Sequence, residues 1–260
     1  IAMVGCRLCT KYGEFVAKEL SYNLSLNNIN IVSGLAKGID THSHIFEQEF
    51  DEDIEAVIAR AQSVGVEKIL LPNIDVESIE RLKTLSQKYP HYCFPMMGLH
   101  PTSVKEDYKE QLAVIRNELT TNKYVAIGEV GLDFYWDRTF EREQIEVFET
   151  QIEWSLEMQL PLSVHVRESG EETLCLLQKY AGKGLRAVIH SFTGDENMAK
   201  KFLTLGEDVY LGVNGIITFK KSESLRAVLK QVVPLNKIVI ETDSPYLSPV
   251  PYRGRRNESA

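Results

Sequence analysis

Short runs of apolar, β-branched residues alternate with longer amphipathic stretches along most of this chain. Eight runs have the length and composition of strands, at residues 39–45 (IDTHSHI), 68–73 (KILLPN), 93–100 (CFPMMGLH), 125–134 (VAIGEVGLDF), 161–167 (PLSVHVR), 186–192 (RAVIHSF), 209–215 (VYLGVNG) and 237–244 (KIVIETDS). Seven stretches between them space apolar residues as helices do, at residues 51–64, 76–89, 105–119, 139–159, 171–180, 195–205 and 221–232. Apolar strands that alternate with helices are typical of a covered parallel sheet. Eight such units predict an α/β fold, the (β/α)8 TIM barrel.

The two ends of the chain depart from this pattern. After the eighth strand a helix is expected, but the chain passes through Pro245, Pro249 and Pro251, so the sequence predicts a barrel that lacks its last helix. Before the first barrel strand, residues 1–38 contain a separate strand–helix–strand pattern at residues 1–5, 13–26 and 29–33. We therefore expect two units, an N-terminal extension over residues 1–38 and a barrel over residues 39–260.

Composition narrows the possible partners and the cellular compartment. An apolar content of 43% and a charged content of 25% are ordinary for a globular protein. No stretch approaches the ~20 consecutive apolar residues of a membrane span, so we expect no membrane partner. Four scattered cysteines fit a reducing compartment, which points to the cytoplasm. The net charge of −8 argues against broad electrostatic coating of nucleic acid, although it permits a locally positive cleft.

Six imidazole and carboxylate side chains fall at or near the carboxyl ends of the predicted strands. They are His42, His44, Glu129, His165, His190 and Asp243. Active sites of TIM barrels lie at this end, because the loops there converge on one mouth. His42 and His44 are two residues apart and should share the inner face of their strand. Four imidazoles and two carboxylates at one mouth predict ligands for two divalent metal ions.

The charge of such a centre favours an anionic substrate. Four neutral imidazoles and two carboxylates contribute −2 and two divalent ions contribute +4, so the site keeps a charge of +2, which suits a phosphodiester. Two ions can hold a hydroxide nucleophile and stabilise the leaving oxygen. We assign the carboxylate between the ions to Glu129. Asp243 would ligate one ion and take the proton from the attacking water.

The motifs between residues 39 and 260 resemble those of a known family. From residue 39 to residue 260 the chain is similar to the TatD-type metal-dependent deoxyribonucleases, through IDTHSHI, GLHP, GEVGLDF, PLSVHVRE, VIHSFTG, GIITFK and ETDSPYLSPVPYRGRRNE. The resemblance implies the same six metal ligands and places His100 near the scissile phosphate. It also implies hydrolysis of DNA, with 3'-5' exonuclease action on single strands, and Mg2+, Mn2+ or Zn2+ as the ions. Tyr252 and Ser259 depart from the family pattern, where His and Pro are common.

Three arginines are candidates for contacts with the substrate. Arg167 follows His165 by two residues, so a phosphate contact and a loop salt bridge are both open. Arg253 and Arg255 belong to a basic cluster with Arg256 just beyond the predicted site. This cluster is either a solvated tail or a set of contacts to backbone phosphates.

The N-terminal extension resembles a different family. Residues 1–40 are similar to the start of the nucleotide-fold domain of DprA, the single-stranded-DNA-binding protein of natural transformation, most specifically through VSGLAKGID. Cys6 and Cys9 form a lone C-x-x-C, a weak signal for a metal or redox site. Residues 13–26 carry an apolar stripe, and we expect this helix to pack where the last barrel helix is missing.

Two other functions remain open on the sequence alone. A barrel amidohydrolase would cleave C–N bonds, but those enzymes often bridge their metals with a modified lysine on the fourth strand, where this chain has Glu129. The other alternative is a non-catalytic fusion of a DprA-like DNA-binding fragment with an inert barrel. The candidate site residues fit either DNA or RNA as the substrate. The sequence does not define an oligomeric state.

Overall fold

The structure is a computed structural model that describes residues 2–3, 32–33 and 38–260. Two short strands, β1 (Ala2–Met3) and β2 (Val32–Ser33), pair in parallel. The expectations for Cys6, Cys9 and the helix at residues 13–26 lie outside the described residues. Within these residues, no helix combines the length and hydropathy needed to cross a membrane.

Eight parallel strands form the barrel that the sequence predicts. They are β3 (Gly38–Asp40), β4 (Val66–Leu71), β5 (Cys93–Pro95), β6 (Ile127–Asp133), β7 (Leu162–Arg167), β8 (Ala187–Ile189), β9 (Val209–Val213) and β10 (Ile238–Ile240). One sheet has the order β3-β4-β5 and the other the order β10-β9-β8-β7-β6. Parallel bridges from Ser43 to Ser244 and from Met97 to Ile127 join the two sheets at both junctions and close the ring.

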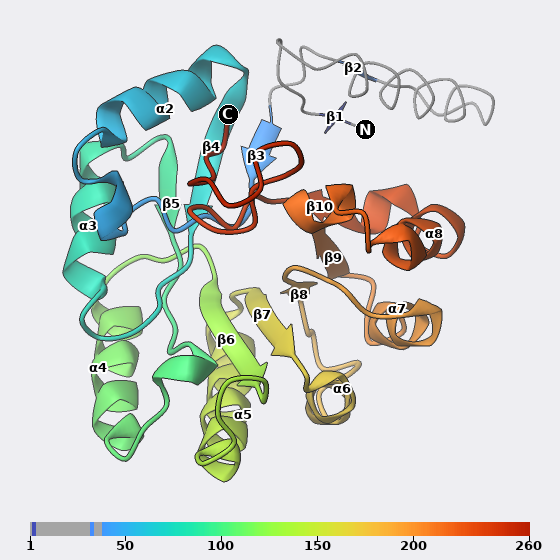
Figure 1. Ribbon diagram of the computed structural model, residues 1–260. Coiled ribbons are helices and arrows are strands. Elements are labelled where there is room, and N and C mark those ends of the chain that lie inside the picture. Colours follow the sequence, from blue (N-terminus) through green and yellow to red (C-terminus); the bar gives the residue numbers. More distant parts are fainter. Residues whose placement is uncertain (1, 4–31, 34–37) are drawn as a thin grey trace.

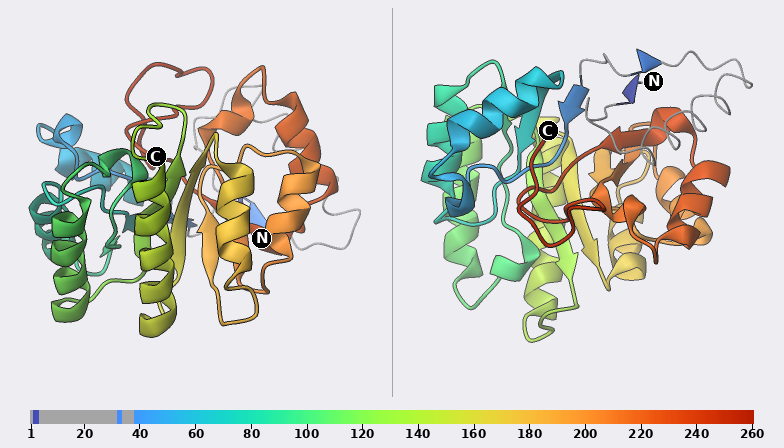
Figure 2. Two further views of the ribbon diagram at one scale, coloured as in Figure 1. Left: turned by 90° about the horizontal axis from the view of Figure 1, so that it is seen from below. Right: turned by 45° about the horizontal axis from the view of Figure 1, so that its top comes forward.

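Residues 38–260 contain seven α-helices. Figures 1 and 2 show them around the outside of the strands. They are α2 (Ile54–Ser63), α3 (Ile79–Lys88), α4 (Tyr108–Thr121), α5 (Glu141–Met158), α6 (Gly170–Gln178), α7 (Glu196–Leu203) and α8 (Glu223–Gln231). Each buries one apolar stripe; α2, for example, buries Val57, Ile58 and Ala61. Amphipathic helices of this kind hide the outer faces of apolar strands, which is why the alternation in the sequence produces this fold.

Several strands are shorter than the sequence predicts. The predicted strand 39–45 ends in the structure at Asp40, and the predicted strand 237–244 ends at Ile240. Ladder pairing stops there because the chain turns into the mouth of the barrel, and Asp243 takes a left-handed backbone conformation with φ of 58°. The polar side chains of the mouth therefore lie just beyond the regular strands in these two places.

The C-terminal segment, residues 241–260, contains no helix and folds back onto the first barrel strand. Figure 1 shows this red segment beside β3 and β4. Ser259 Oγ donates to Asp40 Oδ2 at 2.5 Å, and Asn257 Nδ2 donates to the carbonyl of Thr242 at 2.9 Å. The outward side chains Ile39 and Ile240 remain 46% and 44% exposed, which fits the absence of an eighth barrel helix from the described residues.

Charged groups also fasten the C-terminal segment to α2. Arg256 Nη2 lies 2.7 Å from Asp53 Oδ2, and Arg60 Nε lies 2.7 Å from Glu258 Oε2. The hydrogen bond from Arg256 lowers the pKa of Asp53 from 3.8 to about 2. Arg256, in the basic cluster of the sequence, is therefore engaged within the protein.

We expect Asp53→Asn to destabilise the protein slightly at neutral pH, by less than about 1 kcal/mol, because the pair is partly exposed to solvent. The folded pKa of Asp53 lies below its ordinary value of 3.8. This stabilisation is therefore complete above pH 3.8 and disappears as the pH falls through about 2. Urea unfolding of the parent and the variant at pH 7 and near pH 2 measures the difference, and an equal difference at both pH values would contradict the assignment.

Candidate metal centre

His42 and His44 enter the mouth from the segment that follows β3. The backbone N–H of Ser43 donates to the carbonyl of Leu70 at 3.1 Å, and Ser43 forms the bridge to Ser244. This pairing keeps the segment extended, so the flanking imidazoles share one face. Their Nε2 atoms lie 3.2 Å apart, and both side chains are buried.

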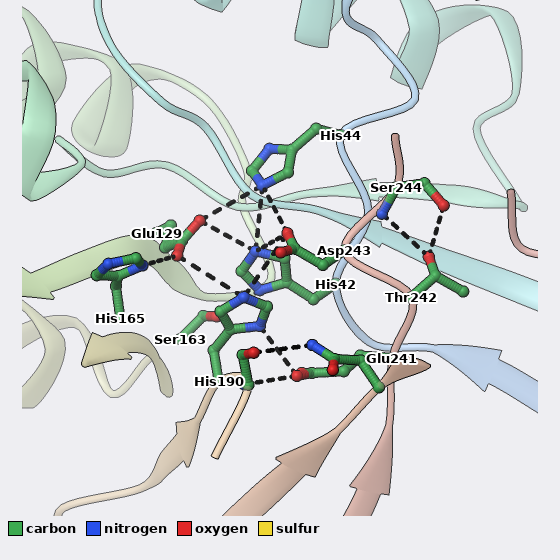
Figure 3. Close-up of polar contacts among 12 residues, drawn as sticks. His42, His44, Glu129, Ser163, His165, His190, Glu241, Thr242, Asp243 and Ser244 are labelled. Carbon is green, nitrogen blue, oxygen red and sulfur yellow. Dashed lines mark hydrogen bonds and ion pairs between the residues drawn. The ribbon is translucent and has the colours of Figure 1, made fainter. Parts of the chain in front are cut away.

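Glu129 lies between imidazoles from opposite sides of the mouth (Figure 3). Its Oε2 lies 3.0 Å from His42 Nε2 and 3.4 Å from His44 Nε2. Its Oε1 lies 2.8 Å from His165 Nδ1. Glu129 comes from β6 and His165 from β7, and the whole carboxylate is only 3% exposed. One buried carboxylate therefore faces two groups of potential ligands.

His190 and Asp243 complete the same side of the mouth. His190 directly follows β8, and its ring stacks on that of His42 with centroids 3.4 Å apart. Its Nε2 lies 3.7 Å from Asp243 Oδ1, which in turn lies 3.5 Å from His44 Nε2. All six residues selected from the sequence thus meet in one place.

Among the described residues, three groups of side chains have donor atoms within 4.8 Å of one another and could hold a metal ion. They are His42–His44–Asp243, His42–Glu129–His190 and His100–Glu129–His165. Imidazole nitrogen and carboxylate oxygen are ligands that Zn2+ and related divalent ions accept in proteins, so the donor set fits a metal centre. Which side chains ligate, and how many ions bind, stay predictions.

The pKa values of the two histidines after β3 are shifted in opposite directions. Burial lowers the pKa of His44, but hydrogen bonds from its ring to Asp243 and Glu129 outweigh this effect and raise the pKa to about 9. Burial and the neighbouring charge of His190 lower the pKa of His42. In the metal-free protein His44 therefore carries a proton near neutral pH. A cation that binds to His44 must displace this proton.

His190 and Glu129 show the same balance of burial and charge. Burial opposes the charged form of His190, but the charges of Glu241, Asp243 and Glu129 raise its pKa well above the ordinary value. Burial also opposes ionisation of Glu129, yet charges on the surrounding imidazoles, His42 foremost, hold the pKa of this carboxyl well below its ordinary value. The carboxylate is therefore ionised and retains its capacity to bind a cation.

His100 lies closer to the predicted ligands than its position in the sequence suggests. Its Nε2 is 3.5 Å from Glu129 Oε1 and 3.3 Å from His165 Nδ1. Its Nδ1 lies 2.7 Å from Thr102 Oγ1, which orients the ring. The geometry is compatible with a contact to substrate, as the sequence predicts, and with a place in the third group of donors.

Three further residues hold the imidazoles in place and were not selected from the sequence. Asp133 Oδ2 lies 3.0 Å from His165 Nε2, and Glu241 Oε1 lies 3.1 Å from His190 Nδ1. Ser163 Oγ lies 3.1 Å from His42 Nδ1. Such partners fix the tautomer and orientation of ligand histidines. Each occurs at a spacing of two or four residues from a selected residue, which is the signal that could have found it.

The three arginines do not enter the group of buried side chains. Arg167 is exposed at the end of β7, with Cζ 4.0 Å from the centroid of the Tyr135 ring. The guanidinium of Arg253 lies 4.4 Å from the centroid of Phe219 and that of Arg255 lies 5.7 Å from the centroid of Tyr252. Their contacts with substrate stay predictions.

We expect Asp133→Asn to weaken metal binding by about 10- to 100-fold. The carboxylate can accept a hydrogen bond from the N–H at His165 Nε2, a tautomer in which Nδ1 is free to ligate. An amide nitrogen in its place would donate to Nε2 and move the ring proton to Nδ1, the atom that faces Glu129. Calorimetric titration with Zn2+ or Mn2+ measures the affinity, with Asp137→Asn on the following loop as the control. Equal affinities of both variants would contradict this role.

Comparisons with known proteins agree with the fold. A model of the family described as TatD related DNase matches residues 39–260, and a model of the family described as DNA recombination-mediator protein A matches residues 1–69. The resemblances stated from the sequence are therefore confirmed. The chain belongs to the family of TatD-related DNases and is a hydrolase that acts on ester bonds.

Individual relatives are named as metal-dependent hydrolases or exonucleases. The chain is 35% identical over 219 residues to the uncharacterized metal-dependent hydrolase YabD of Bacillus subtilis, covering 84% of each chain. It is 33% identical over 224 residues to the 3'-5' ssDNA/RNA exonuclease TatD of Cronobacter sakazakii, again covering 84% of each. The crystal structure of YjjV, a TatD homologue from Escherichia coli, superimposes with a TM-score of 0.77 at 29% identity and covers 86% of both chains.

Proposed function

We propose that this protein hydrolyses phosphodiester bonds of single-stranded DNA from the 3' end, with two divalent metal ions in the candidate centre. The observation that carries the proposal is the position of Glu129, whose two carboxylate oxygens lie 3.0 Å from His42 Nε2 and 2.8 Å from His165 Nδ1. A carboxylate that faces two groups of imidazoles can be shared by two ions. The exonuclease named among the relatives supports the choice of substrate and direction.

The residues would divide into two groups around Glu129. His42, His44 and Asp243 would hold one ion, and His165 and His190 the other. Bound divalent ions supply a water nucleophile at neutral pH and stabilise negative charge on the leaving oxygen. Asp133 is hydrogen-bonded to the ring of His165, and Glu241 forms a close ion pair with His190, so both rings have a carboxylate partner before substrate binds.

Other side chains would handle the proton and the phosphate. Asp243 Oδ1 lies at the mouth, 3.5 Å from His44 Nε2, where we assign it the proton of the attacking water. His100 would contact the scissile phosphate, because its Nε2 points into the same site. Arg253 and Arg255 are exposed, and we assign them contacts with backbone phosphates farther along the strand.

We also propose the division of the chain. We assign residues 1–38 to a DprA-like segment and residues 39–260 to the barrel unit; the start of the barrel at β3 and the match of the TatD-related model over residues 39–260 support this assignment. The model of DNA recombination-mediator protein A matches residues 1–69 and so overlaps the first part of the barrel unit. The β1–β2 pair is the described part of that N-terminal segment.

The direct test uses end-labelled single-stranded DNA and protein stripped of metal with EDTA. We expect no cleavage without metal, and stepwise shortening from the 3' end after addition of Mg2+, Mn2+ or Zn2+. A matched RNA strand and a double-stranded DNA define the substrate range. Absence of cleavage with every metal would reject the nuclease function. Turnover of amide or dihydropyrimidine substrates instead would favour an amidohydrolase, and retention of DNA without cleavage would favour the non-catalytic fusion.

A further inference from the structure

An exposed aromatic and cationic cluster lies beside the candidate centre. It consists of Tyr135 and Trp136, on the loop between β6 and α5, and Arg167 at the end of β7. The Tyr135 side chain is 54% exposed and that of Trp136 is 69% exposed, and neither belongs to the hydrophobic core. Large aromatic side chains rarely stand together in solvent without a function in binding. We call these three residues the aromatic cluster.

The three side chains contact one another in an open arrangement. Arg167 Cζ lies 4.0 Å from the ring centroid of Tyr135 and 4.9 Å from that of Trp136. The two rings meet edge to face, with centroids 4.9 Å apart and planes at 83°. In the described part of the chain Arg167 makes no ion pair with a carboxylate. The guanidinium therefore orders the rings and keeps N–H groups available for an anion.

One carboxylate links the aromatic cluster to the candidate centre. Asp133 Oδ1 accepts hydrogen bonds from the backbone N–H groups of Tyr135 at 3.0 Å and Trp136 at 3.4 Å. Its other oxygen lies 3.0 Å from His165 Nε2. Arg167 is two residues beyond His165 on the same strand. The cluster is therefore held at a fixed place next to the side chains that would surround the scissile bond.

Trp136 also borders a cavity of about 50 Å3 that Lys105 and Phe140 line as well. A cavity of this size holds water molecules. Most of the Trp136 side chain is open to solvent, and this exposed part is where a planar ligand could stack.

We propose that the aromatic cluster is a base-stacking subsite for one nucleotide of a single strand whose phosphodiester is cleaved in the adjacent centre; this inference rests on the proposed function. Planar rings offer a stacking surface to any base, because every base has a π face, and the free guanidinium N–H groups suit the adjoining phosphate. A duplex hides these faces within its own stack, so the subsite selects single strands or frayed ends. It also accepts all four bases.

The test follows the fluorescence of Trp136. The chain has two tryptophans, so Trp154→Phe leaves Trp136 as the sole one. This protein is titrated in EDTA, so that no metal supports cleavage, with oligo(dT) and with an abasic oligonucleotide of the same length. We expect oligo(dT) to quench the fluorescence and to bind about tenfold more tightly than the abasic strand. A duplex of the same length should cause little quenching.

Substitutions then separate stacking from general binding. By fluorescence anisotropy of a labelled strand, Trp136→Ala should weaken the affinity for oligo(dT) about tenfold and leave the affinity for the abasic strand unchanged. Trp136→Phe keeps an aromatic face and should retain most of the affinity. An equal loss for both strands, or equal binding of both by the parent, would overturn the subsite.

A parallel cleavage assay with Mg2+, Mn2+ or Zn2+ distinguishes this inference from the proposed function. Cleavage of single strands with no preference for bases over abasic sites would reject the subsite and support the nuclease function. Quenching by oligo(dT) with no cleavage under any metal would support the subsite as a nucleic-acid contact and reject the nuclease function.

Discussion

Glu129→Gln is expected to reduce metal-dependent cleavage of single-stranded DNA by about a thousandfold or more. The substitution keeps the shape of the side chain but removes the charge that faces His42, His44 and His165. An amide offers one neutral oxygen in place of two charged ones, so it cannot bridge two divalent ions with equal strength. Initial rates on a labelled strand measure the effect, and calorimetric titration with Mn2+ should show fewer or weaker sites than in the parent.

The control for this experiment is Glu207→Gln, which makes the same chemical change at an exposed carboxylate on the turn that leads into β9, at the end of the barrel opposite the mouth. Circular dichroism and thermal unfolding establish that both variants are folded. If Glu129→Gln cleaves DNA within a few-fold of the parent rate, the shared carboxylate and the two-ion centre are wrong. A loss of activity with unchanged metal binding would place the role of Glu129 in contact with substrate.

Gly131→Ala is expected to lower the free energy of unfolding by about 3 kcal/mol or more, or to prevent folding. Gly131 lies on β6 with φ of 141°, a backbone conformation that residues with a side chain rarely adopt. A Cβ at this position would lie 2.1 Å from the carbonyl oxygen of His165 on β7. Because the three atoms nearest to this Cβ all belong to the backbone of His165, the two strands that carry Glu129 and His165 would have to separate.

Gly182→Ala provides the matched control for this prediction. Gly182 also has a positive φ, 76°, but an added Cβ would meet nothing within 4 Å. The free energy of unfolding of this variant should fall by only about 1 kcal/mol, because alanine is strained in this backbone conformation but meets no neighbouring atom. Urea unfolding of both variants and the parent measures the two effects. Equal losses would mean that the close approach of β6 and β7 tolerates a methyl group.

The barrel, and the convergence of the candidate site residues at its mouth, could be predicted from the sequence because both follow from local periodicity. Apolar runs, amphipathic stretches and polar residues at the carboxyl ends of strands are enough to bring His42, Glu129 and His190 together once the sheet closes. The lengths of the first and last barrel strands could not be read in this way. The mouth takes its final shape from pairings between distant residues, such as the bridge between Ser43 and Ser244.

The supporting contacts of the site were harder to predict for the same reason. A spacing of two residues places Ser163 on the face of His165, but its hydroxyl lies against His42, which is 121 residues away. Arg256 pairs with Asp53 across 203 residues, and nothing in the local sequence distinguishes it from Arg253 or Arg255. Sequence patterns specify which face a side chain occupies, while partner choice depends on how the closed barrel brings remote segments together.

The contact between Asp40 and Ser259 has a consequence for the order of folding. Asp40 is buried at the start of the barrel, and burial raises the pKa of its carboxyl to about 6, so its ionised form depends on the hydrogen bonds it receives. Two of these come from Thr242 and one from Ser259, which are 202 and 219 residues away. During synthesis on the ribosome the first barrel strand can pair with β4 early, but these partners of Asp40 are made only after most of the barrel. Such high contact order slows folding and leaves early strands in need of protection from aggregation.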